Sequence, residues 1–194
     1  MNGTHGTFRI NVKSIIEDGF KIDGDGYWCG KGAYFWDYES KNYRSEALIL
    51  ARSHWRQSFN LKRRKPIEEN DCAILDVQFD DSMNMINTLE TEVRERLHLL
   101  LSKQEEKYLE ATERGHEVNF GGLNGVYDHF IELVEKVSGK TVDAIRFTVN
   151  VNRKYFPKRY GLLNDPTCLV VKTPDKVIKD VQVEYVDMLK ERCG

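Results

Sequence analysis

The sequence predicts an α+β fold, because strand-like stretches lie near both ends of the chain and helical patterns fill its middle. A hydrophobic share of 40% and a charged share of 31% over 194 residues are typical of a globular chain with its own core. We therefore expect a single domain over residues 1–194, in which residues 86–125 form a helical and loop insertion.

Runs of β-branched and aromatic residues predict the strands. The clearest is Cys72–Phe79 (CAILDVQF), which is apolar enough to be buried. The other expected strands are residues 3–12, 144–151, 168–172 and 177–186.

Apolar residues at helical spacing predict the helices. They are expected at residues 11–19, 45–58 and 126–138, and glycines at 19 and 139 would end two of them. Residues 83–117 are highly charged and predict one long helix or two, with Asn87 or Thr88 as the cap. The glycines of residues 119–125 predict a loop.

Composition limits the class of protein. A net charge of −2 gives no overall attraction to nucleic acid, and no apolar run is long enough to span a membrane. No signal peptide is visible, and the cysteines show no pattern for binding a metal or forming disulfides. We expect free thiols, no metal and a cytoplasmic location. The cysteines are Cys29, Cys72, Cys168 and Cys193.

Residues 26–43 (GYWCGKGAYFWDYESKNY) combine aromatic side chains with glycines at 26, 30 and 32. Glycine weakens a core strand, so its presence suggests tight bends or a ligand that lies against the backbone. Aromatic rings on such a bend can stack on a flat ligand ring. The alternative is a glycine-rich hairpin whose aromatic residues belong to the core.

Two segments are locally basic and contain aromatic residues. Residues 56–66 (RQSFNLKRRKP) include Arg63, Arg64 and Lys65, and residues 153–160 (RKYFPKRY) begin with Arg153, Lys154 and Tyr155. Such segments can contact phosphates and stack on bases. A solvated loop is the alternative for each.

Three separated motifs carry a family resemblance. They are His5-Gly6-Thr7, the run GYWCGKGAYF at residues 26–35, and residues 183–186 (VEYV) near the C-terminus. In this order they resemble the His-Tyr-Glu signature of the ADP-ribosyltransferase superfamily, in its diphtheria-toxin-like and poly(ADP-ribose) polymerase branch. The resemblance implies two packed, mainly antiparallel sheets around an NAD cleft, with flanking helices.

The resemblance also implies roles for individual residues, with NAD as co-substrate. His5 would bond a ribose hydroxyl, the Gly6 backbone would bind the nicotinamide carboxamide, and Tyr34 would stack on the nicotinamide ring. Glu184 would be the catalytic carboxylate, and Gln182, on the same strand face, would orient the acceptor. Further cofactor contacts are implied at Thr7, Lys21, Tyr27, Gly32, Asn42 and Tyr43.

The chemistry of NAD cleavage explains these residue types. Nicotinamide leaves as a neutral molecule and the ribose becomes positively charged, as in other oxocarbenium-like reactions. A carboxylate about 4 Å from that charge contributes roughly 4 kcal/mol, or about a thousandfold in rate. We expect Glu184→Gln to remove most activity and to leave NAD affinity intact. The alternatives are an edge-strand charge for Glu184 and a buried, backbone-bonded histidine for His5.

The expected function is an NAD-dependent mono-ADP-ribosyltransferase, a toxin or defence effector that modifies a macromolecule. The basic segments favour RNA or DNA over protein as the acceptor. A neutralising antitoxin is the further partner that this context implies. The alternatives are an NAD glycohydrolase that depletes NAD and an inactive module that binds NAD or ADP-ribose.

Overall fold

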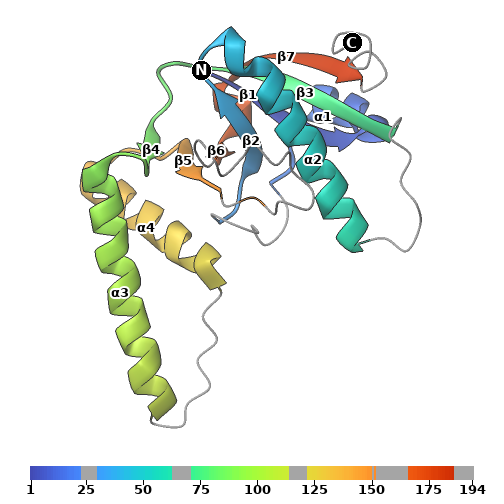
Figure 1. Cartoon of the computed structure of the whole chain (residues 1–194). Coiled ribbons are helices and arrows are strands. Elements are labelled where there is room, and N and C mark those ends of the chain that lie inside the picture. The colour runs from blue at the N-terminus through green and yellow to red at the C-terminus, as the bar shows by residue number, and fades with distance from the viewer. Residues whose placement is uncertain (23–29, 63–70, 114–121, 150, 152–165, 186–194) are drawn as a thin grey trace.

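The computed structural model describes residues 1–22, 30–62, 71–113, 122–149, 151 and 166–185 (Figure 1). It confirms the α+β class. Its elements in chain order are β1 (Asn2–Phe8), η1 (Arg9–Asn11), α1 (Val12–Asp18), β2 (Ala33–Tyr38), η2 (Lys41–Tyr43), α2 (Arg44–Lys62), β3 (Cys72–Phe79), β4 (Met85–Asn87), α3 (Thr91–Glu113), α4 (Gly122–Ser138), β5 (Ala144–Thr148), β6 (Thr167–Val171), α5 (Pro174–Val177) and β7 (Ile178–Tyr185).

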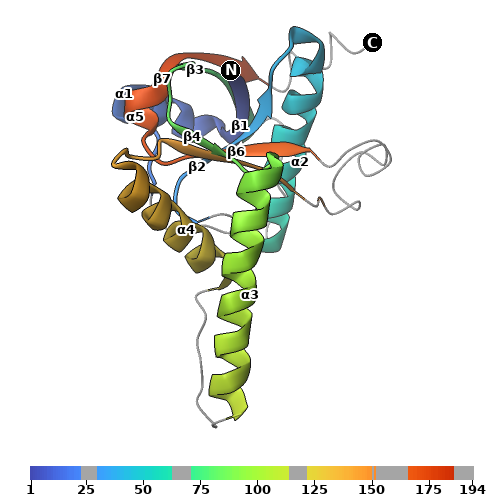
Figure 2. The same cartoon turned by 90° about the vertical axis from the view of Figure 1, so that its left-hand side faces the viewer.

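Within the described residues, seven strands form one sheet in the order β4-β5-β6-β2-β1-β3-β7. All neighbours are antiparallel except β4 and β5, which are parallel. The described strands therefore form one sheet and not the expected pair of packed sheets. The sheet is nevertheless divided, because only three residue pairs join β1 to β2. Figure 2 shows β3 and β7 arching above the level of β4, β5 and β6.

Helices cover both faces of this sheet. The helix α2 packs on one face, where Trp55, Ile74 and Val170 belong to the same buried cluster as residues of α3 and α4. The short helices α1 and α5 pack on the other face with Phe35 and Leu169. Figure 2 shows α1 and α5 on the side of the sheet away from α2. We call these the α2 face and the α1 face.

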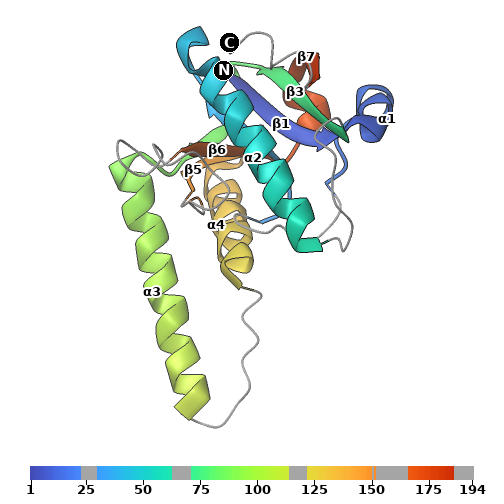
Figure 3. The ribbon, with the colours of Figure 1, turned by 45° about the vertical axis from the view of Figure 1, so that its right-hand side comes forward.

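The expected insertion of residues 86–125 contains most of β4, the whole of α3 and the first residues of α4. The helix α3 carries its apolar residues Val93, Leu97 and Leu101 toward the α2 face, while Leu99 is largely exposed. Figure 3 shows that the C-terminal part of α3 reaches beyond the other labelled elements. No helix within the described ranges combines the length and the apolar content needed to cross a membrane.

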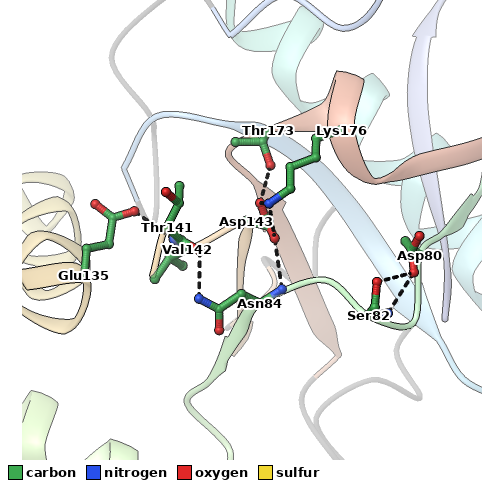
Figure 4. Close-up of polar contacts among 9 residues, drawn as sticks. All are labelled: Asp80, Ser82, Asn84, Glu135, Thr141, Val142, Asp143, Thr173 and Lys176. Carbon is green, nitrogen blue, oxygen red and sulfur yellow. Dashed lines mark hydrogen bonds and ion pairs between the residues drawn. The ribbon is translucent and has the colours of Figure 1, made fainter. Parts of the chain in front are cut away.

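A buried aspartate connects the insertion to the sheet (Figure 4). Asp143, just before β5, accepts hydrogen bonds from Thr173 Oγ1 at 2.8 Å, Lys176 Nζ at 2.8 Å and the backbone N–H of Asn84 at 3.0 Å. Burial alone would raise the pKa of Asp143, but these bonds outweigh it and lower the pKa below its ordinary value. One carboxylate thus links the segments before β4, before β5 and around α5.

The two cysteines in the described residues, Cys72 and Cys168, are buried thiols. Burial raises the pKa of the Cys72 thiol to about 12. A thiol that stays protonated at neutral pH is a poor nucleophile, so Cys72 acts as a small apolar residue of β3.

Candidate functional site

The pairing of β1 with β2 stops near the centre of the sheet, and we call this interruption of the ladder the opening. Their pairing covers Asn2 to Thr4 of β1 and ends at the pair Thr4–Trp36. Beyond that point β1 continues to pair with β3 as far as Phe8, and β2 continues to pair with β6 as far as Ala33. No ladder pair joins Gly6 to Tyr34, although the register would set them opposite one another. Beyond the pair Thr4–Trp36, β1 is therefore paired with β3 and β2 with β6, but β1 and β2 are not paired with each other.

The imidazole of His5 bridges the opening. Its Nδ1 lies 2.8 Å from the carbonyl oxygen of Tyr34, and since a carbonyl only accepts, Nδ1 carries the proton. The ring packs against Phe20 and Phe35 on the α1 face, at centroid distances of 5.4 and 5.6 Å. Burial lowers the pKa of His5, although the bond to Tyr34 opposes this effect. A neutral His5 therefore fixes the backbone of Tyr34.

Gly6 lies on the α2 face of the opening. A Cβ at this position would overlap the carbonyl of Ala51 and would lie 2.9 Å from Cβ of Trp55. The absence of a side chain lets α2 approach β1 closely beside the opening. Gly6 thus presents only main-chain groups here, and its contact with a nicotinamide stays a prediction.

Tyr34 has a fixed phenol. Its hydroxyl donates a 2.7 Å hydrogen bond to the carbonyl of Gly30, in the segment before β2. Its partly buried ring packs against the cluster on the α2 face, which includes residues of α4. Gly30 in turn touches the carboxylate of Asp128 on α4, and Lys172 Nζ bonds that carboxylate at 2.8 Å. The Tyr34 hydroxyl is thus connected through Gly30 to α4 and to the residue after β6.

Glu184 lies elsewhere and has a strong partner. Its Oε1 is 2.5 Å from Nη2 of Arg44, and Nε of Arg44 bonds Asp76 at 2.6 Å. Tyr38 donates to the same aspartate at 2.6 Å. Burial opposes the charge of Arg44, but the bonds to Glu184 and Asp76 outweigh it and raise the pKa of Arg44. We call Tyr38, Arg44, Asp76 and Glu184 the Arg44 network.

The expected convergence of three side chains is wrong. Glu184 is paired with Ile74 and faces α2, whereas His5 is paired with Leu75 and faces α1. Tyr34 shares the face of Glu184, but two strands separate their strands, which is roughly 14 Å at normal strand spacing. Side chains alternate between the two faces of the sheet along each strand. The order of the three motifs in the sequence does not show which face each residue occupies, so it could not predict this separation.

The other expected cofactor residues are more scattered. Thr7 is buried on the α1 face, Gly32 lies directly before β2, and Lys21 is exposed after α1. Asn42 and Tyr43 are exposed in η2. They follow the end of β2, roughly 13 Å along the strand from Tyr34, so the structure does not bring them to its ring.

On β7, Gln182 is exposed and its amide lies 3.4 Å from Asp180. It shares a strand face with Glu184, as the sequence predicted, because both are paired with residues of β3 two positions apart. The remaining predicted site residues lie outside the described residues. They are Tyr27, Arg63, Arg64, Lys65, Arg153, Lys154 and Tyr155.

Four residues of this region were not predicted from the sequence, namely Arg44, Asp76, Asp128 and Lys172. Asp76 carried a usable signal, because a charge inside the apolar run of residues 72–79 demands a partner. The other three have no local signal, since their partners lie from 32 to 140 residues away.

Among the described residues, no group of three or more His, Cys, Asp or Glu side chains has the geometry of a metal site. Comparison of the chain with models of known families, with curated proteins and with solved structures finds no match. Any functional proposal must therefore depend on the motifs and on the geometry around Tyr34.

Proposed function

We propose that this protein is an NAD-dependent mono-ADP-ribosyltransferase that acts on a macromolecular acceptor. The observation that carries the proposal is the opening between β1 and β2 at Gly6 and Tyr34, bridged by His5. A motif that resembles the family's NAD-binding signature thus coincides with the one interruption of pairing between the central strands of the described sheet.

The residues at the opening can supply the hydrogen bonds and the aromatic ring that would bind a nicotinamide. A carboxamide offers two N–H donors and a carbonyl acceptor, and the main chain of Gly6 can pair with one N–H and the carbonyl on the side where β2 is absent. A ring held there would be within reach of the Tyr34 phenyl group, which can stack on it. His5 and Gly30 hold Tyr34 at both its backbone and its hydroxyl, so the ring is oriented before a ligand arrives.

This geometry changes the role proposed for His5. Its Nδ1 holds the Tyr34 carbonyl, and its ring lies on the face away from the Tyr34 side chain. We therefore assign His5 as a positioning residue for Tyr34. The catalytic role of Glu184 stays a prediction, and its ion pair with Arg44 supplies a structural explanation for the same residue.

The acceptor class is proposed from the sequence alone, because Arg63, Arg64, Lys65 and residues 153–160 lie outside the described residues. NAD labelled at the adenylate phosphate, incubated with the protein and with separate RNA, DNA and protein pools, tests the proposal. We expect label to enter RNA or DNA. Label in protein only would mean that the acceptor is a protein and not a nucleic acid. Nicotinamide release with free ADP-ribose would indicate a glycohydrolase. Unchanged NAD in every pool would overturn the proposal.

A further inference from the structure

The helix α4 brings a carboxylate to the ring that the proposed function requires. Asp128 lies against Gly30, whose positive φ of 79° and missing Cβ are both needed for this contact. Because the Tyr34 hydroxyl bonds the Gly30 carbonyl, these contacts place the carboxylate within roughly 9 Å of the phenol oxygen. Asp128 lies on α4 just beyond the expected insertion of residues 86–125.

The environment of Asp128 suits a ligand-facing acid. Its side chain is 38% exposed, and Lys172, only 15% exposed, bonds Oδ1 at 2.8 Å. Among the described residues no hydrogen-bond donor reaches Oδ2. Lys172 follows directly after β6, the strand beside β2, so it fixes the carboxylate relative to the sheet. One oxygen is thus anchored and the other is available.

We propose that Asp128, and not Glu184, is the carboxylate that stabilises the reacting ribose, an inference that rests on the proposed transferase function. Glu184 is 13% exposed, is bound by Arg44 and lies three strand spacings from β2. Asp128 has the greater access to solvent and touches the segment that holds the Tyr34 phenol. A nicotinamide stacked on Tyr34 would carry its ribose close to that ring, within range of the charge on Asp128.

The step balances without a further reagent. The bond between C1′ of the ribose and the nicotinamide nitrogen breaks, and its electron pair neutralises the pyridinium ring. Positive charge on the ribose is stabilised by the Asp128 carboxylate while an acceptor oxygen or nitrogen forms the new bond to C1′. The acceptor's proton passes to solvent. Lys172 keeps the carboxylate oriented and does not exchange a proton in this scheme.

The test measures nicotinamide release and NAD affinity for the full chain and for matched variants. We expect Asp128→Asn to lower the rate of release by about a hundredfold to a thousandfold, with NAD affinity changed less than about fivefold. Glu132→Gln, one turn further along α4 and largely exposed, is the control and should keep the wild-type rate. Glu184→Gln compares the two acids directly, because a loss of more than tenfold in this variant, in a folded protein, would return the role to Glu184 and overturn the assignment of Asp128.

A second variant separates the carboxylate from the ion pair. Lys172→Met breaks the same pair and keeps the acid, so we expect it to release nicotinamide at least tenfold faster than Asp128→Asn. Equal losses in these two variants, or a wild-type rate in Asp128→Asn, would overturn the assignment of Asp128. An inactive wild-type protein would instead overturn the proposed function itself, and with it this inference. Circular dichroism shows whether each variant is folded.

Discussion

At the scale of single residues, Arg44 determines how Glu184 behaves. Its guanidinium bonds both Glu184 and Asp76, and Tyr38 completes the contacts of Asp76. Burial and the neighbouring Asp76 carboxylate raise the pKa of Tyr38, so the phenol remains a donor at neutral pH. The Arg44 network ties the edge strand β7 to the start of α2.

Glu184→Gln should therefore act mainly on stability. The amide keeps the shape but loses a charge-assisted hydrogen bond, so we expect the free energy of unfolding to fall by about 1–3 kcal/mol. Urea unfolding measures this change, and Asp180→Asn, an exposed position of the same strand, is the control. A folded Glu184→Gln protein with a hundredfold loss of nicotinamide release would show that Glu184 is catalytic after all.

Two histidines make stability depend on pH. Burial, with a smaller contribution from the charge of His5, lowers the pKa of His54 to about 4 from an ordinary 6.5. Between these values the unfolded chain binds a proton that the folded chain does not. The free energy of unfolding should therefore fall as the pH is lowered through this window, by a few kcal/mol in all. The lowered pKa of His5 acts in the same direction.

Replacement of His54 tests this dependence. His54→Gln removes the titrating group, so urea unfolding measured between pH 7 and pH 4 should show a shallower loss of stability than in the wild-type protein. The ring of His54 also contacts Trp36 edge-on and its Nε2 lies 3.2 Å from Ser58 Oγ, so some stability should be lost at every pH. An unchanged slope would mean that His54 is not the group responsible.

At the scale of elements, Asp143 joins three separate segments. Asp143→Asn leaves Lys176 without its buried counter-charge and weakens the contact to Asn84. We expect a loss of about 2–4 kcal/mol in the free energy of unfolding at pH 7. Because the folded-state pKa of Asp143 is lowered, the difference between wild type and variant should shrink as the pH falls below about 4. A constant difference across that range would contradict this account.

Most elements could be predicted from the sequence, because their patterns are local. The strand Cys72–Phe79 has the expected bounds, and the helix at 45–58 corresponds to α2 with small shifts at its ends. The strand β4 was missed, since three residues are too few to show an alternating pattern. Neither Asn87 nor Thr88 caps α3, because Thr88 bonds the carbonyl of Arg146 and the helix begins at Thr91.

The candidate site could be predicted only in part. Its glycines and Tyr34 stood out because their types conflict with a simple core strand. The partners of Glu184 and Asp128 could not be found in this way, because Arg44 and Lys172 reach them through tertiary contacts. The face that each strand residue occupies also depends on register, which no single motif records.

At the scale of the whole molecule, the described sheet consists of two halves that meet at β1 and β2. Three ladder pairs and the bond from His5 to Tyr34 hold the halves together beside the opening. The helices α2 and α4 both pack on the face where the Tyr34 ring lies. The central claim is that this junction binds the nicotinamide end of NAD.

The most direct test of this claim is the rate of nicotinamide release from NAD by the wild-type protein and by Tyr34→Ala. We predict that the wild-type protein releases nicotinamide, and that removal of the ring lowers both the rate and the affinity for NAD at least tenfold, with the fold intact by circular dichroism. Equal rates and affinities in the two proteins would contradict the claim.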